Sequence, residues 1–199
     1  MDDSHIRSMS TRLGLCAARL FLCSFVTVCA LPLQGYAQEL LSQFNHSAWT
    51  PKDGAPADTW TMAQTPDGWL WFGTPTGLYR FDGVQFERIT LEGLDPRRSR
   101  AISMLFASDT GALWIGYVFG GVSLLKDGGF THFADAQGFG RGTVVSLTED
   151  TRGAIWAACA DGLRRYDGRQ WTRVGSDWGF PDTWAPAVFV DQRGTVLRK

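Results

Sequence analysis

Histidine and cysteine are scarce in this chain, which limits its metal and disulfide chemistry. The 199 residues include only three histidines and four cysteines, and three of those cysteines precede residue 30. Cys159 then has no cysteine partner beyond residue 37, so we predict no intrachain disulfide and a small buried strand residue there. His46 and His132 are too few for a metal cluster. We predict no metal site and no cofactor.

Other absences bear on catalysis and on partners. The sequence has no nucleophile elbow, and its carboxylates are scattered through turns, so neither a nucleophilic triad nor a paired acid–base site can be assigned. Beyond residue 37 the chain has 16 basic and 18 acidic residues. This balance argues against nucleic acid as the main partner. No stretch after residue 44 shows a long apolar stripe at helical spacing, so we do not expect long helices.

The first 37 residues have the pattern of an export signal. Three arginines precede an apolar run over 20–33, and Gly35-Tyr36-Ala37 places small residues where a signal peptidase cleaves. The run is shorter than the roughly 20 residues of a membrane-spanning helix. We predict a signal peptide over 1–37, with Met9 as an alternative start, and a mature chain over 38–199.

A repeat of 43 and then 42 residues organises the mature chain. Its anchors are Trp71, Trp114 and Trp156. A glycine precedes each anchor by three residues, and an Asp-Gly pair follows each at 82–83, 127–128 and 167–168. A fourth unit begins at Asp191, with Leu197 in the place of the tryptophan. Periods of this length are typical of repeat architectures.

Each unit predicts four short strands joined by tight turns. In the first unit the extended runs are 60–64, 69–74, 78–81 and 86–90, rich in aromatic and β-branched residues. Asp-Gly between two runs indicates a hairpin. Four antiparallel strands in about 40 residues form a propeller blade. We therefore predict an all-β, incomplete β-propeller with three four-stranded antiparallel blades over about 59–90, 101–133 and 142–174, and a partial fourth over 184–199. The repeated tryptophans should pack between blades.

The sequence also predicts that this chain forms only part of a propeller. The stretch 44–50 resembles the last strand of a blade, as in Phe130–Phe133, and a lone amino-terminal strand often completes the final blade of a closed propeller. Closed propellers have typically four to eight blades. We expect the chain to be the amino-terminal part of a longer protein, and expect the isolated chain to be marginally folded or poorly soluble.

An alignment of the units suggests a ligand-binding rim. We interpret Asp109, Asp150 and Asp191 as turn caps. When the units are aligned on Asp67 and these three aspartates, the residues seven positions earlier are Trp60, Ile102, Thr143 and Trp184. Nine positions earlier stand Asp58, Arg100, Arg141 and Asp182. We predict that the arginines bind a carboxylate or sulfate and that Trp60 or Trp184 stacks on a sugar. Solvated loop charge and interblade packing are the alternatives.

The repeat resembles the two-component regulator propeller repeat, which occurs in the periplasmic sensor region of bacterial hybrid histidine kinases and related diguanylate cyclases. The resemblance rests on Asp67–Thr74, Gly77–Gly83 and Gly162–Gly168, and it covers about 44–197. The second unit departs from the pattern at Tyr117–Gly120. The third has Ala158-Cys159 where the pattern has Gly-Thr.

The resemblance implies a periplasmic ligand-sensing propeller that binds a glycan or another small ligand. It also implies a parent protein anchored through a carboxy-terminal membrane span, with a cytoplasmic kinase or cyclase, and it leaves a homodimer of that parent open. The sequence contains no kinase or cyclase motif, so we predict that these residues are not an enzyme. A propeller lyase or hydrolase and a structural protein-interaction propeller are the alternatives.

Overall fold

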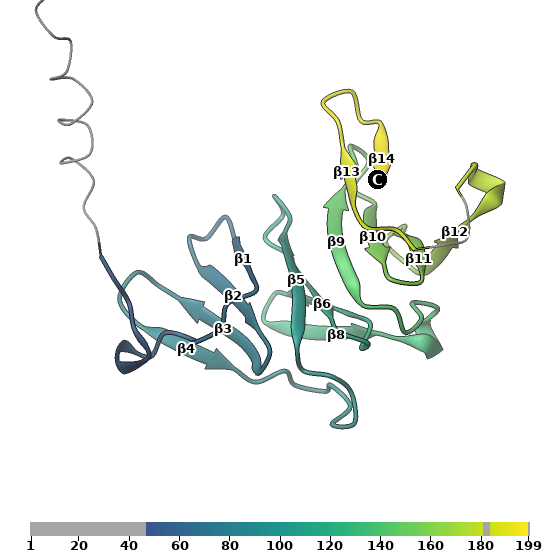
Figure 1. Cartoon of the computed structure of the whole chain (residues 1–199). Helices are drawn as coiled ribbons and strands as arrows, with labels where there is room; N and C mark the ends of the chain where they lie inside the picture. The colour runs from purple at the N-terminus through teal and green to yellow at the C-terminus, as the bar shows by residue number, and fades with distance from the viewer. Residues whose placement is uncertain (1–46, 181–183, 199) are drawn as a thin grey trace, which may run out of the picture. The chain divides into compact units, whose positions relative to one another are not determined.

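The computed structural model describes residues 47–180 and 184–198 (Figure 1). The predicted signal peptide over 1–37, His46 and Asp182 lie outside the described residues. No helix within the described ranges is long and apolar enough to cross a membrane.

The described chain forms three four-stranded sheets and one two-stranded sheet, all antiparallel. Blade 1 contains β1 (Thr61–Gln64), β2 (Leu70–Thr74), β3 (Gly77–Phe81) and β4 (Phe86–Ile89). Blade 2 contains β5 (Ile102–Ala107), β6 (Leu113–Tyr117), β7 (Val122–Lys126) and β8 (Gly129–Phe133). Blade 3 contains β9 (Val144–Glu149), β10 (Ile155–Cys159), β11 (Gly162–Tyr166) and β12 (Trp171–Val174). The final hairpin pairs β13 (Val188–Val190) with β14 (Val196–Arg198).

Strands within each sheet follow chain order, as expected for propeller blades. Short 3₁₀ helices follow the N-terminal segment, blade 2 and blade 3: η1 (Pro51–Asp53), η2 (Asp135–Gln137) and η3 (Ser176–Trp178). Each ends at a glycine with positive φ, at 85°, 78° and 73°. The all-β fold of three antiparallel four-stranded sheets is confirmed, and the sheets do not close into a ring.

The first strands of successive blades lie side by side (Figure 1). One hydroxyl links each neighbouring pair. Leu105 N donates to Thr61 Oγ1 at 3.1 Å. Ser103 Oγ donates to Val144 O at 2.7 Å, and Ser146 Oγ donates to Val188 O at 3.0 Å. These contacts identify β1, β5, β9 and β13 as the inner strands, each tied to the next.

A glycine on the second strand permits the first two of these close approaches. A Cβ on Gly73 would lie 2.5 Å from Ile102 Cγ2, and one on Gly116 would lie 2.6 Å from Val144 Cβ. Both distances are shorter than real Cβ contacts, so only glycine fits there. Blade 3 has Ala158 at the corresponding position, where it packs in the core beside Ala185.

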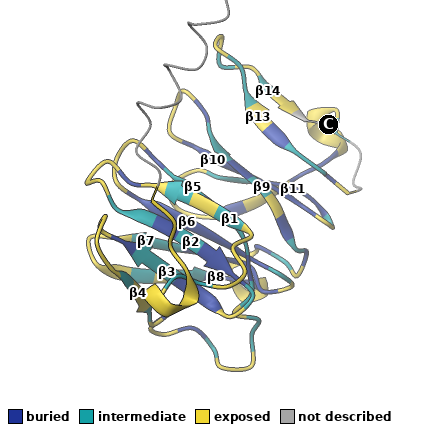
Figure 2. Ribbon diagram, turned by 60° about the vertical axis from the view of Figure 1, so that its left-hand side comes forward, coloured by how far each residue is buried: buried dark blue, intermediate teal, exposed yellow. Residues whose placement is uncertain are grey.

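Three apolar clusters fill the interfaces between successive sheets. Figure 2 shows the buried residues along the strands. Trp71 packs with Leu113, Ile115 and Tyr117 of blade 2. Trp114 packs with Ile155 and Trp171 of blade 3. Trp156 packs with Ala185 and Val188 ahead of and within β13. The anchor tryptophans are 2–6% exposed. The predicted interblade role of these tryptophans is therefore confirmed, because each one faces the blade that follows it.

Trp49 occupies a site that a preceding blade would use. Its ring centroid lies 4.9 Å from that of Phe81 and 6.1 Å from that of Phe86. Phe133, at the end of blade 2, contacts the corresponding rings of blade 3, Tyr166 and Trp171, at 5.2 and 6.3 Å. Trp49 therefore packs on blade 1 as the last residue of a preceding outer strand would.

Candidate functional site

The predicted rim residues lie at the start of the inner strands. Strand pairings Thr61–Gly73, Ile102–Tyr117 and Val144–Cys159 place these starts beside the turns between the second and third strands of each blade. Trp60 and Trp184 are 56% and 60% exposed. Arg100, Arg141 and Asp58 are also exposed. The described rim residues are therefore accessible to a ligand from one end of the blades.

The alignment that defined the rim needs a correction of register. In all four units a turn carbonyl accepts the glycine N–H at 2.9–3.0 Å; the carbonyls belong to Thr65, Ser108, Asp150 and Asp191. The first two units therefore align on Thr65 and Ser108, not on Asp67 and Asp109. These turns have the same length in every unit, but Asp67 lies two residues and Asp109 one residue after the equivalent position, which hid the shift. As a result Trp60 is exposed while Ile102, its expected counterpart, is fully buried.

The two rim arginines differ in their surroundings. Arg141 forms an ion pair with Asp135 of η2, and this pairing raises the arginine's pKa. Arg100 instead borders a hollow of about 260 Å³ that Arg88 also lines. Arg88 donates to Thr76 O at 2.8 Å there. Two guanidinium groups at one hollow suit an oxyanion.

Sequence reasoning missed Phe119, an exposed aromatic in the turn after β6. Phe119 is 73% exposed and has a φ of 55°, unusual for a bulky residue. Its turn contains three residues between β6 and Gly121, where blades 1 and 3 have two. Val118 N donates to Ala101 O at 3.0 Å, which holds the turn against the segment containing Arg100. The departure from the repeat pattern at Tyr117–Gly120 was the sequence feature that could have indicated this turn.

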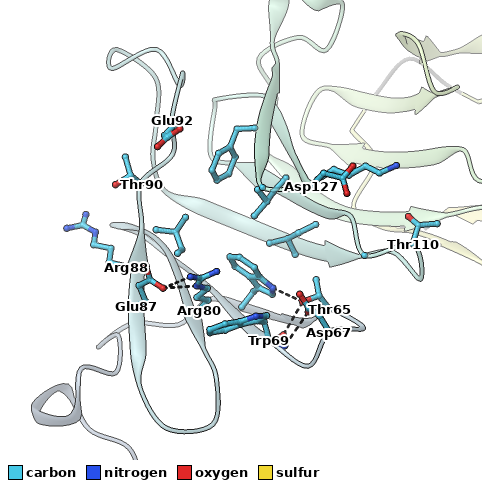
Figure 3. Close-up of a pocket in the computed structure, with 18 residues that line it drawn as sticks. Thr65, Asp67, Trp69, Arg80, Glu87, Arg88, Thr90, Glu92, Thr110 and Asp127 are labelled. Atoms are coloured by element: carbon cyan, nitrogen blue, oxygen red, sulfur yellow. Dashed lines mark hydrogen bonds and ion pairs between the residues drawn. The ribbon is translucent and has the colours of Figure 1, made fainter.

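A larger groove lies between blades 1 and 2 and shares Arg88, Ile89 and Thr90 with the Arg100 hollow (Figure 3). Its volume is about 610 Å³. Arg80 stacks over the Trp69 ring at 4.3 Å and pairs with Glu87 at 2.7 Å. Lys126 at the end of β7 and Asp127 of the β7–β8 turn also line the groove, together with the buried Trp71 and Leu113. Finding this groove requires the blade pairing, so the sequence alone did not indicate it.

In the described part of the chain, His132, Ser123, Tyr117 and Cys159 have side chains of types common in catalysis, and each has a partner within the fold or is buried. His132 Nε2 lies 2.7 Å from Glu92 O, and its Nδ1 lies 2.6 Å from Ser123 Oγ. Ser123 Oγ also donates to the buried Tyr117 hydroxyl at 2.9 Å, and burial raises that tyrosine's pKa to about 12. Burial likewise raises the pKa of Cys159 to about 12, so this thiol is a poor nucleophile. Within the described ranges no three His, Cys, Asp or Glu side chains form a metal-binding group.

No protein family model and no curated protein matches the sequence. Solved structures do match the fold. The extracellular domain of BT3049 from B. thetaiotaomicron, described as a hybrid two-component system, matches at TM-score 0.64 and 15% identity, over 76% of this chain and 23% of that chain. The extracellular domain of BT4673 from the same organism, described as a one-component or a hybrid two-component system, matches at TM-scores of 0.63 and 0.64 and 22% identity, over 80% of this chain and 22% of that chain.

A second group of similar structures consists of lyases. Virginiamycin B lyase from Staphylococcus aureus matches at TM-score 0.57 and 11% identity, over 71% of this chain and 48% of that chain. The chain spans less than a quarter of the length of the two sensor domains. At these identities the likeness shows the fold alone, and the predicted propeller fold is confirmed.

Proposed function

We propose that this chain is the amino-terminal part of an extracytoplasmic, ligand-sensing propeller of a signalling receptor. The observation that carries the proposal is one repeat pattern, present three times in register, in a fold shared with extracellular domains of two-component systems. The receptor is exported by residues 1–37 and signals through a membrane span to a kinase or cyclase output domain, both encoded beyond these residues.

The ligand in this proposal is a glycan fragment or another small molecule with a carboxylate or sulfate. Arg100 and Arg88 border the same hollow, and the turn that carries the exposed Phe119 is bonded through Val118 N to Ala101 O, next to Arg100 in the chain. Trp60 and Trp184 add accessible rings at the starts of their strands. An arginine fork for the anion and aromatic rings for the apolar sugar face are the groups such a ligand requires.

An enzyme is the weaker candidate. Lyases share the fold, but with lower TM-scores than the sensor domains. Both ring nitrogens of His132 have partners from the fold, and the Cys159 thiol is buried. No observation on the described residues favours a catalytic site over a binding site.

The receptor proposal has a direct genetic test. We expect DNA downstream of codon 199, read in all frames, to encode further blades, a membrane span, and a kinase or cyclase domain. We also expect alkaline phosphatase fused after residue 199 to be active in cells, and a fusion lacking residues 1–37 to be inactive. An active fusion without those residues, or a downstream hydrolase domain with no span, would contradict the proposal.

The rim has a separate test in the complete sensor domain. For a glycan that the parent binds, the variants Arg100→Ala and Arg141→Ala should weaken calorimetric affinity by about ten- to a hundred-fold each, because each loses a charge-assisted contact. The Arg141 variant should lose less, since Asp135 already pairs with that arginine. Arg193→Ala removes an exposed arginine in the β13–β14 turn and serves as the control. Unchanged affinity in both rim variants would leave these arginines as solvated loop charge.

A further inference from the structure

The groove between blades 1 and 2 is open because two positions carry smaller side chains than their counterparts in blade 3. Blade 3 presents the paired Tyr166 and Trp171 to blade 2, where both rings pack against Trp114. In blade 2 the same paired positions are Leu125 and Phe130. The groove between blades 1 and 2 is about 610 Å³. Between blades 2 and 3 the space is divided into two smaller hollows, one of about 230 Å³ beside Trp114 and Tyr166 and one of about 430 Å³ beside Phe133 and Trp171.

One side of the groove is the free edge of a sheet. In the described sheet β4 pairs only with β3. Four consecutive residues at this edge line the groove, from Glu87 to Thr90. Alternate side chains of a strand point to opposite faces, and Figure 3 shows Arg88 pointing away from the groove. The groove therefore borders the backbone of β4 as well as its side chains. An unpaired strand edge of this kind offers N–H and C=O groups to another extended chain.

The charges that remain without protein partners in the groove are mostly acidic. Arg80 is occupied by Trp69 and Glu87, and Arg88 donates to a backbone carbonyl. Glu92 and Asp127 are exposed, line the groove, and form no ion pair within the described ranges. Arg88 and Lys126 also line the groove without a described ion pair, but Figure 3 shows Arg88 pointing away from the groove. Such a lining favours an occupant with positive charge.

We propose that this groove binds an extended peptide segment of a partner protein. The segment adds to the edge of β4, inserts an apolar side chain over Leu125 and Phe130, and places a lysine or arginine against Glu92 and Asp127. This interaction surface adjoins the Arg100 hollow, with which it shares Arg88, Ile89 and Thr90, but the proposal does not depend on the receptor proposal.

The experiment uses the full chain and two fluorescent octapeptides, one alternating leucine with lysine and one alternating leucine with glutamate. We expect the lysine peptide to increase in anisotropy on titration and to bind at least ten-fold more tightly than the glutamate peptide. We expect its affinity to fall as salt increases. Two N-methylated versions of the lysine peptide can be compared, one methylated at the odd and one at the even peptide bonds. One version should lose binding and the other should keep it, because an added strand bonds through every second residue.

The repeat itself supplies the decisive variant. The double substitution Leu125→Tyr and Phe130→Trp introduces the pair that blade 3 already accommodates, so it should close the groove and reduce peptide affinity at least ten-fold. Asp127→Asn tests the charge alone, and asparagine tolerates the φ of 50° at this position. It should weaken the lysine peptide several-fold. Asp177→Asn removes an exposed carboxylate in η3 and is the matched control.

Several results would overturn the proposal. Equal binding of the two peptides would exclude the acidic lining as a determinant. Unchanged affinity in both the Asp127→Asn variant and the closed-groove variant would place the peptide elsewhere. Binding of maltohexaose, competed by neither peptide and lost on groove closure, would show a saccharide site instead. The Asp127→Asn result holds even if the double variant fails to fold.

Discussion

At the scale of single residues, one turn position shows how the repeat keeps a role while changing its chemistry. Thr65 accepts the Trp71 indole N–H at 2.9 Å, and Asp150 accepts that of Trp156 at 3.0 Å. Asp150 also accepts the N–H groups of Arg152 and Ala154. Asp191 accepts the corresponding two backbone groups, but Leu197 replaces the tryptophan. The carboxylate in blade 3 therefore carries one more buried bond than its counterpart at Asp191.

This difference predicts unequal costs of removing two similar aspartates. Asp150→Ala should lower the free energy of unfolding by about 3 kcal/mol, because it leaves a buried indole N–H and a buried amide without acceptors. Asp191→Ala should cost under about 1 kcal/mol, since water reaches that turn. Urea unfolding of both variants measures the difference. Equal losses would show that the indole bond adds nothing.

Asp150 also predicts a loss of stability in acid. Burial alone would raise the pKa of Asp150, but hydrogen bonds from Trp156, Ala154 and Arg152 outweigh it and lower the pKa below the ordinary 3.8. A carboxyl group with a lowered pKa stabilises the fold above its unfolded-state pKa and loses that effect as pH falls through the folded-state value. Urea unfolding at about pH 6 and about pH 3 should show this loss. In Asp150→Asn the loss should be smaller; an identical loss would assign the acid sensitivity to other groups.

At the scale of elements, the strands were predictable and the register between blades was not. The predicted run 78–81 differs from the observed β3 (Gly77–Phe81) by one residue, because Asp-Gly turns and aromatic strands are local signals. Aligning the units on their aspartates failed because the aspartate does not occupy the same turn position in every unit. Trp71 follows Thr65 by the same six residues as Trp156 follows Asp150, yet the nearest aspartate, Asp67, lies inside the turn. The groove depends on which strands face each other across two blades. The small side chain at Leu125 therefore could not be related to a groove until the packing of the blades was known.

The three-residue turn of blade 2 allows a test of strain within one element. Phe119→Gly should raise the free energy of unfolding by about 1 kcal/mol, because glycine adopts positive φ without the penalty that a side chain incurs. The ring is 73% exposed, so little packing is lost. Thermal unfolding compares the variant with Val84→Gly, an exposed turn residue. A destabilised Phe119→Gly would show that the ring packs in solution.

At the scale of the whole molecule, the two ends of the blade series expose apolar side chains that internal blades cover. Met62 of β1 is 58% exposed on the face turned away from blade 2, and Phe189 of β13 is 55% exposed. Repeat arrays require covered terminal faces for solubility. The expected marginal solubility of the isolated chain follows from these two faces.

Self-association of the isolated chain should therefore depend on these terminal positions. Met62→Lys combined with Phe189→Lys should shift the chain toward monomer in sedimentation velocity, because charge opposes apolar contact and edge pairing. Val84→Lys, at an exposed hairpin turn, is the control and should have little effect. Association unchanged by the double substitution would place the contact elsewhere.

The docking of Trp49 on blade 1 has a mechanical consequence. This tryptophan is 44% exposed and holds the amino-terminal stretch through two ring contacts, whereas the next interface contains nine buried residues. Tension applied near residue 47 would act on the Trp49 contacts before it acts on the larger interface between blades 1 and 2. An optical-tweezers trace should then show a small early rupture, abolished by Trp49→Ala, before the larger release of blade 1. The contact of Trp49 with Phe81 and Phe86 would then break first under tension, while the blades remain folded.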